Sequence, residues 1–137
     1  MNAVQRLKDA NMRTTQNRIA ILELIEEHDE PMSHAEILGL LDDSFDRVTL
    51  YRILDAFVEK RLIHRVQGTD GTWRFCSHDI DAESCPGGHA HFLCDVCGKM
   101  TCLPQIPMPH VTLDECYIVN KKQFLITGIC PSCRVET

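Results

Sequence analysis

The chain has 137 residues, a formal net charge of −6 and eight cysteines. This length fits one domain or two small ones, and the acidic balance argues against binding nucleic acid through bulk positive charge. No signal peptide opens the chain and no apolar run approaches a membrane span, so we expect a cytoplasmic protein with reduced cysteines rather than a secreted disulfide scaffold.

The first half predicts four helices. Apolar residues recur at helical spacing over residues 1–10, 15–27, 33–41 and 46–60. Ser33 followed by Glu36 forms a capping box, which marks the start of the third helix. Two helices joined by a short turn and preceded by another helix match a helix-turn-helix.

A β-hairpin is predicted next. Apolar and polar residues alternate over 62–67 and 72–76, and the turn between them at 68–71 contains two glycines. Helices followed by a hairpin make a winged helix-turn-helix. We therefore expect an α+β fold with a winged-helix domain at 1–80, a hinge linker at 81–88 and a second small domain at 89–137.

The second domain predicts strands, one short helix and a final hairpin. In chain order we expect strands at 89–93 and 99–103, a helix at 110–116, and hairpin strands at 117–119 and 123–129. Pro104, Pro107 and Pro109 lie between the second strand and the helix. Because proline cannot donate to a strand ladder, we expect no regular structure over them.

Two CxxC pairs dominate the second domain: Cys94 with Cys97, and Cys130 with Cys133. A spacing of two residues lets one tight turn present two sulfurs to one ion, and four thiolates suit a tetrahedral structural zinc. Such a zinc would fasten the C-terminal end of the chain to the middle of the domain. Just upstream, His89 and His91 would project from one face of a strand, so a second metal site of different character is expected beside the first.

The helix at 46–60 would be the recognition helix of the helix-turn-helix, which enters the major groove with its N-terminal residues. Arginine can contact phosphate or guanine, threonine a thymine methyl, and tyrosine a phosphate or base edge. The preceding helix would cross the DNA backbone. The alternative is that these residues form only a solvated helical face. The candidate DNA contacts are Arg13, Gln16, Arg18, Arg47, Thr49, Tyr51 and Arg52.

These motifs, taken in order, resemble the ferric uptake regulator family over nearly the whole chain. The resemblance is carried by Thr49-Leu50-Tyr51-Arg52 in the winged helix, by His89-x-His91-x2-Cys94-x2-Cys97-Gly98, and by the terminal Cys130-x2-Cys133. It implies a metal-dependent, homodimeric transcriptional repressor, not an enzyme, whose second half is a zinc-stapled α/β dimerisation domain. It also implies that His89 and His91 are ligands of a regulatory metal between the two domains.

The chain departs from the iron-type pattern at the regulatory site. The end of the wing offers Cys76 where those members tend to carry a glutamate, and the first wing strand offers His64. Thiolate and imidazole ligands suit tetrahedral zinc, whereas carboxylate-rich octahedral sites suit iron or manganese. Regulatory ligands are therefore predicted at His64, Cys76, His89 and His91, with zinc as the effector and Cys102 as a reserve ligand. His34 is an alternative donor, although an exposed first-turn histidine is the simpler interpretation.

Binding of one metal by both domains would fix the hinge and so set the distance between the two recognition helices of a dimer. Iron-, manganese- or peroxide-responsive regulation within the same family remains an alternative. A zinc enzyme is a weaker alternative, because the H-E-x-x-H motif of zinc hydrolases does not occur in the chain. A redox dithiol at Cys94 and Cys97, or a metal-storage protein, are further alternatives.

Overall fold

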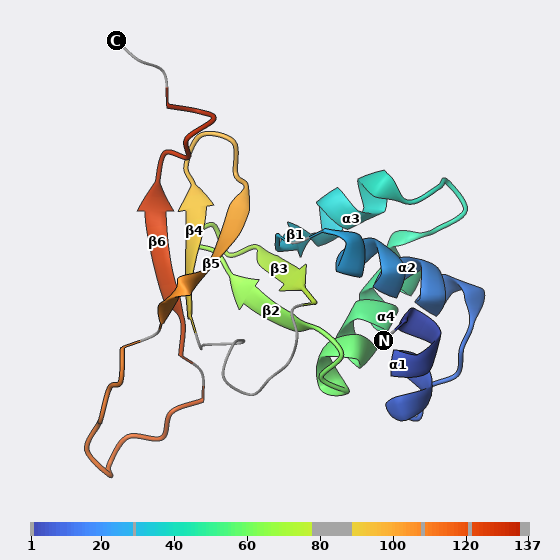
Figure 1. Cartoon of the computed structure of the whole chain (residues 1–137), viewed down its shortest axis with the longest axis horizontal. Coiled ribbons are helices and arrows are strands. Elements are labelled where there is room, and N and C mark those ends of the chain that lie inside the picture. Colours follow the sequence, from blue (N-terminus) through green and yellow to red (C-terminus); the bar gives the residue numbers. More distant parts are fainter. Residues whose placement is uncertain (1, 29, 78–88, 108, 121, 135–137) are drawn as a thin grey trace.

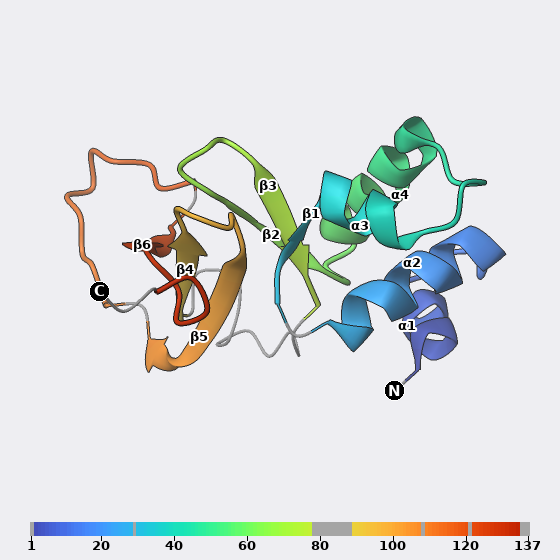
Figure 2. The same cartoon turned by 90° about the horizontal axis from the view of Figure 1, so that it is seen from above.

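The computed structural model describes residues 2–28, 30–77, 89–107, 109–120 and 122–134, without the side chains of His89 and Pro104. Figure 1 shows helices gathered at one end of the molecule, a small sheet in the middle and a second sheet at the other end, and Figure 2 shows the same order from above. We call residues 2–77 the winged lobe and residues 89–134 the second lobe. The predicted hinge at 81–88 lies outside the described residues, so the domain boundaries stay predictions.

The winged lobe contains the four predicted helices. They are α1 (Ala3–Asp9), α2 (Gln16–Glu27), α3 (His34–Leu40) and α4 (Arg47–Glu59). Each begins after a residue whose side chain accepts a hydrogen bond from a backbone N–H in the first turn, which is the role of an N-cap. The caps are Asn2, Thr15, Ser33 and Asp46. The capping box at Ser33 and Glu36 is confirmed, with both reciprocal hydrogen bonds present at 3.2 and 3.0 Å.

The buried face of α4 differs in part from the predicted one. The spacing of Val48, Tyr51, Leu54 and Val58, with Ile53 and Phe57 widening the stripe, predicts which face of this helix is buried. Leu54 and Phe57 are buried as predicted, together with Leu50, and Ile53 and Val58 are half-buried against the core. Val48 is 58% exposed and Tyr51 is 40% exposed. The prediction was therefore wrong for Val48 and Tyr51 and confirmed for Leu54 and Phe57. Arg47 and Val48 at the start of α4 therefore present their side chains to solvent.

A three-stranded sheet completes the winged lobe. Its strands are β1 (Met32–Ser33), β2 (His64–Gln67) and β3 (Trp73–Cys76), in the antiparallel order β1-β3-β2. The hairpin of β2 and β3 was predicted, whereas the two-residue strand β1 was not. Side chains alternate between the two faces of a strand, so neighbouring residues of β3 point to different layers. Phe75 lies in the helical core, while Arg74 and Cys76 face the second lobe.

The second lobe is built on a sheet of β4 (His89–Cys94), β5 (Met100–Pro107) and β6 (Phe124–Gly128), in the order β5-β4-β6. The expectation that the prolines exclude regular structure is wrong for Pro104 and Pro107, since β5 continues to Pro107. The strand tolerates them because it lies at the edge of the sheet, where a missing N–H costs little. The pairing with β4 also shifts register between His89 and Ala90.

Two further predictions for the second lobe are wrong. Residues 110–116 contain a turn but no helix, and 117–119 form no strand. β6 pairs in parallel with β4 instead of closing a hairpin, with His91 opposite Leu125. The apolar residues of 111–119 stay largely exposed, so no described part of the chain packs on them to hold a helix or strand.

The two lobes touch along the wing. Val66 of β2 packs in one buried cluster with Leu93 and Met100 of the second lobe. Gln67 and Gln123 exchange two hydrogen bonds of 2.9 Å, from backbone N–H to side-chain oxygen and from side-chain amide to backbone oxygen. The wing is therefore a shared layer, packed on helices on one side and on the second sheet on the other. None of the helices in the described ranges is long and apolar enough to cross a membrane.

Candidate metal centres and nucleic-acid interface

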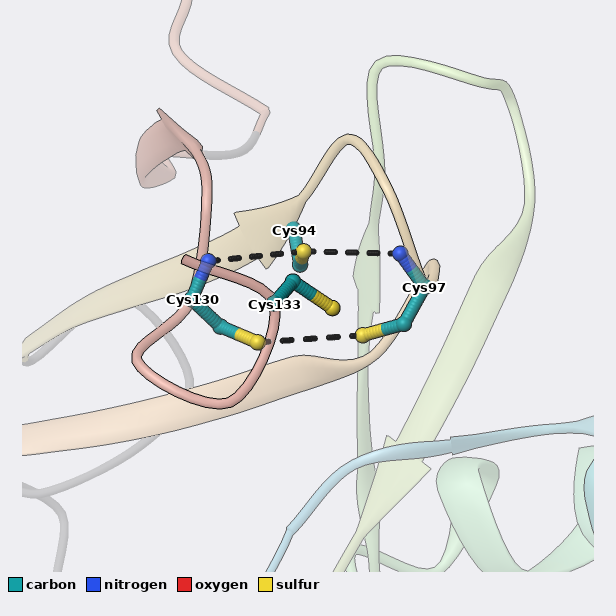
Figure 3. Close-up of side chains that lie close together, drawn as sticks. All are labelled: Cys94, Cys97, Cys130 and Cys133. Atoms are coloured by element: carbon teal, nitrogen blue, oxygen red, sulfur yellow. Dashed lines mark hydrogen bonds between the residues drawn. The ribbon is translucent and has the colours of Figure 1, made fainter. Parts of the chain in front are cut away.

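The four cysteines of the two CxxC pairs come together at one end of the second sheet. Cys94 ends β4, Cys97 follows in the next turn, and Cys130 and Cys133 lie in the turn after β6. Gly98 has φ of 75°, a conformation that glycine adopts without strain, and so closes the first turn. All four sulfurs lie within 4.8 Å of one another, and Figure 3 shows them pointing into one space. We call these four residues the four-cysteine cluster.

The four-cysteine cluster fits a tetrahedral metal ion. Metal–sulfur bonds of about 2.3 Å place two sulfurs of a tetrahedral site about 3.8 Å apart. The Sγ atoms of Cys97 and Cys130 are separated by 3.9 Å. The cluster can therefore hold a metal with little rearrangement of the chain.

Backbone hydrogen bonds favour the thiolate form of one member of the cluster. Backbone N–H groups of Cys97, Cys130 and Val96 each donate to Cys94 Sγ at 3.4 Å. They lower the pKa of the Cys94 thiol to about 6. Hydrogen bonds with the sulfurs of Cys130 and Cys97 raise the pKa of Cys133 to about 12. Four close sulfurs cannot all stay ionised without a cation between them, so a bound metal would replace the shared protons.

A second cluster lies at the contact between the lobes. Donor atoms of Cys76, His91 and Cys102 all lie within 4.8 Å of one another. Cys76 ends β3 of the winged lobe, whereas His91 and Cys102 are register partners on β4 and β5, which places them on one face of the second sheet. Cys76 and His91 are almost fully buried, with 1% and 2% exposure.

His64 lies beside this cluster. It is the register partner of Cys76 on the neighbouring wing strand, and its Nε2 lies 2.6 Å from Cys76 Sγ. His64 is outside the set of three donors that lie within 4.8 Å of one another. Two ligand atoms of one tetrahedral zinc lie about 3.5 Å apart, so Nε2 would have to draw back from the sulfur for both to bind the same ion. The side chain of His89, also a predicted ligand, lies outside the described residues. Thus the structure gathers Cys76 and His91 with the predicted reserve, Cys102.

Five of the seven predicted DNA contacts are exposed on the surface of the winged lobe, and the other two, Thr49 in α4 and Arg18 in α2, are half-buried. Arg47, Tyr51 and Arg52 of α4 are exposed and Thr49 is half-buried; near α2, Arg13 and Gln16 are exposed and Arg18 is half-buried. The Arg18 side chain donates to the Arg13 carbonyl at 3.1 Å. Asp46 caps α4 through a 2.6 Å hydrogen bond from the Thr49 N–H, which lowers the pKa of its carboxyl. The surface has exposed donors suited to phosphates and base edges.

Sequence reasoning missed two contacts of this region. The buried guanidinium of Arg74 donates to the carbonyl of Gly98 at 3.0 Å, directly after the first CxxC pair. The His34 ring packs between the rings of Tyr51 and Phe75. An arginine in an otherwise apolar strand was a usable signal for the first contact. No local pattern signals the second, because it joins three separate elements.

The winged lobe is a helix-turn-helix with a wing, and thiol and imidazole side chains line its contact with the second lobe. The second lobe is a small sheet with the four-cysteine cluster at one end. Together these features define a two-lobed, metal-binding transcriptional regulator. Comparison with known proteins agrees. A sequence model of the ferric uptake regulator family matches residues 9–127. The chain therefore belongs to the ferric uptake regulator family and is a metal-responsive transcriptional regulator.

Individual relatives match over nearly their full length. The transcriptional regulator FurA of Mycobacterium tuberculosis is 24% identical over 140 residues, covering 96% of this chain and 90% of the relative. The fold resembles that of the Vibrio cholerae ferric uptake regulator, with a TM-score of 0.66 and 21% identity over 92% of this chain and 98% of the other. It also resembles a zinc uptake regulator complexed with zinc and DNA, with a TM-score of 0.65 and 21% identity over 94% of this chain and 88% of the other.

Proposed function

We propose that this protein is a zinc-responsive repressor that binds operator DNA as a homodimer when a metal occupies the cluster of Cys76, His91 and Cys102. The observation that carries the proposal is that this cluster takes one ligand from β3 of the winged lobe and two from the sheet of the second lobe. A metal bound there would supply a cross-link between the lobes. His64, which contacts Cys76, is the proposed fourth ligand.

The donor set favours zinc over iron or manganese. Two thiolates and one or two imidazoles are the ligands of tetrahedral zinc, and the described cluster includes no carboxylate. We propose a second zinc, structural in role, in the four-cysteine cluster, where it would fasten residues 130–133 to the end of β4.

Control of DNA binding would come from the position of the wing. Cys76 ends the strand that packs on the helical core, so fixing it against β4 and β5 fixes the orientation of the winged lobe. Half-sites on DNA lie about 34 Å apart, and only some orientations let both recognition helices of a dimer reach them. The metal would favour the binding form only to the extent that it binds that form more tightly.

The proposed partners are operator DNA and a second copy of the chain, both in the cytoplasm. Arg13, Gln16, Arg18, Arg47, Thr49, Tyr51 and Arg52 are the proposed DNA contacts. The second lobe carries exposed apolar side chains at Leu113, Tyr117, Ile118 and Ile129, with Ile118 89% exposed. Apolar surface of this kind is typical of a protein interface. The proposed dimer would cover it.

The test starts from protein stripped of metal with a chelator. Zinc, iron(II), manganese(II) and nickel(II) are added separately, and binding to selected duplexes is followed by fluorescence anisotropy. We expect zinc to restore sequence-specific binding at the lowest free concentration, and the Cys76→Ala variant to lose this response while keeping one zinc per chain. Cys116→Ala is the matched control, because Cys116 is exposed and outside both clusters. A normal zinc response in Cys76→Ala would contradict the proposal, and a response to iron or manganese alone would reject zinc as the effector.

A further inference from the structure

The imidazole of His34 links the recognition helix to the wing. His34 is the first residue of α3, and its ring centroid lies 4.1 Å from that of Tyr51 in α4, with the rings inclined by 62°. On its other side the centroid lies 4.7 Å from that of Phe75 in β3, with the rings inclined by 75°. Both are edge-to-face arrangements of the kind that aromatic rings prefer. Three elements therefore meet at one histidine.

Backbone structure fixes the place of this ring. The capping box at Ser33 sets the start of α3, and Met32, just before it, pairs with Phe75 across β1 and β3. Phe75 is fully buried in the helical core. His34 is thus packed against a fully buried neighbour, whereas Tyr51 is 40% exposed and could otherwise sample several rotamers.

The electrostatic setting of His34 favours the neutral imidazole. Burial of the ring lowers its pKa, the nearby Asp55 carboxylate opposes this shift, and Arg65 adds to it. A neutral imidazole packs against aromatic rings without the cost of burying a charge. His34 also lies outside both donor clusters of the described residues. These observations favour a packing role over the metal-donor role considered from the sequence.

The strand behind His34 carries a proposed metal ligand. Phe75 and Cys76 are adjacent in β3 and point to opposite faces, Phe75 to the helices and Cys76 to the second lobe. A displacement of the end of β3 that moves Cys76 must move Phe75 as well. Because interiors are closely packed, such a shift is felt at His34 and then at Tyr51.

We infer that His34 is a positioning residue for operator recognition, which holds the Tyr51 side chain against β3 and so links the DNA-contacting surface to the strand that carries Cys76. The inference rests on the proposed function of α4 as the recognition helix. His34 itself need not touch DNA. It restricts Tyr51 to one orientation before binding, so that less rotamer freedom is lost in the complex.

The test is a double-mutant cycle on the full-length, zinc-loaded protein. His34→Ala, Tyr51→Ala and the double variant are compared by anisotropy with a specific and a non-specific duplex at fixed salt. We expect His34→Ala to weaken specific binding about two- to tenfold, the range that loss of an aromatic pair gives, and to leave non-specific binding unchanged. In the Tyr51→Ala background the same substitution should have less than about a twofold effect.

Two further variants separate positioning from folding. His34→Phe keeps an aromatic ring and should restore specific binding, whereas His28→Ala, at the end of α2, is the matched control and should change nothing. Additive effects in the cycle, equal losses on both duplexes, or no rescue by phenylalanine would overturn the inference.

A readout without DNA separates this inference from the proposed function. Nuclear magnetic resonance of the His34 ring protons should show ring-current shifts, of which the part due to Tyr51 is lost in Tyr51→Ala while the part due to Phe75 remains. If the wild-type protein binds no duplex with any metal, the proposed function fails, while these shifts still report the packing. Unshifted His34 protons overturn the inference even where zinc-dependent DNA binding holds.

Discussion

Cys102→Ala provides the sharpest test of the ligand set. The sequence predicted Cys102 only as a reserve, but the structure places its sulfur within 4.8 Å of the donor atoms of Cys76 and His91. Zinc sites with four protein ligands bind with roughly 10–16 kcal/mol, or about 2.5–4 kcal/mol per ligand. Since water can occupy the vacated position, we take the lower end of this range and expect about a 10²-fold loss of affinity at the second site.

The assay is zinc competition with a chromophoric chelator, combined with cobalt substitution. Cobalt(II) bound to thiolates gives charge-transfer bands whose intensity follows the number of bound sulfurs. We expect Cys102→Ala to reduce these bands at the second site while leaving the bands of the four-cysteine cluster intact. Cys102→Asp should recover much of the affinity, because zinc also accepts carboxylate oxygen.

The reasoning fails if Cys102→Ala binds the second zinc as tightly as the parent protein does. In that case the ligand set would be the one predicted from the sequence, and His89→Ala should lose the site instead. Cys116→Ala, which removes an exposed thiol outside both clusters, controls for general effects of cysteine loss.

Three other substitutions test separate parts of the structure. Cys94→Ala should lose the structural zinc and with it the dimer, as measured by metal analysis and light scattering; a stable dimer would contradict this. Ser33→Ala should lower the free energy of unfolding in urea by about 1 kcal/mol, because it removes the cap of α3; no change would show that the cap is replaced by solvent. His34→Phe should gain stability relative to the wild type as pH falls below about 6.5. Burial lowers the pKa of His34 in the folded protein below its value in the unfolded chain, so the unfolded chain binds a proton on this imidazole at a higher pH than the folded protein does. The wild type therefore has its full stability above the pKa of His34 in the unfolded chain. It loses stability as the pH falls from that value through the lower pKa of the folded protein, whereas phenylalanine does not titrate. Parallel pH profiles for the two proteins would contradict that assignment.

Local signals predicted the winged lobe well. Caps and apolar periodicity place the helix boundaries within about one or two residues, and the glycine-containing turn at 68–71 predicts the hairpin of β2 and β3. These features depend on residues close together in the chain. The four-cysteine cluster was also predictable, because two residues of spacing in each pair already bring the sulfurs onto one turn.

The second lobe could not be predicted as well, because its contacts are long-range. β5 continues through Pro104 and Pro107 since it is an edge strand, and edge position is a property of the whole sheet. Register alone places Cys102 opposite His91, and no spacing within the sequence reports that pairing. The same holds for residues 111–119, whose apolar side chains suggested secondary structure but remain exposed in the single chain.

The small core of the second lobe explains why metals belong to its architecture. Among the described residues, its buried hydrophobic cluster consists of Leu93 and Met100, with half-buried Leu125 and with Val66 supplied by the winged lobe. Burial of a side chain of this size contributes about 1.5–3 kcal/mol, which is small beside the conformational entropy of ordering the lobe. The four-cysteine cluster joins β4 to the chain after β6, and the second cluster joins this sheet to β3. We propose that metal in the two sites adds stability to the contacts that orient the winged lobe, so that folding of the second lobe and control of DNA binding would both depend on the cysteines of these two clusters.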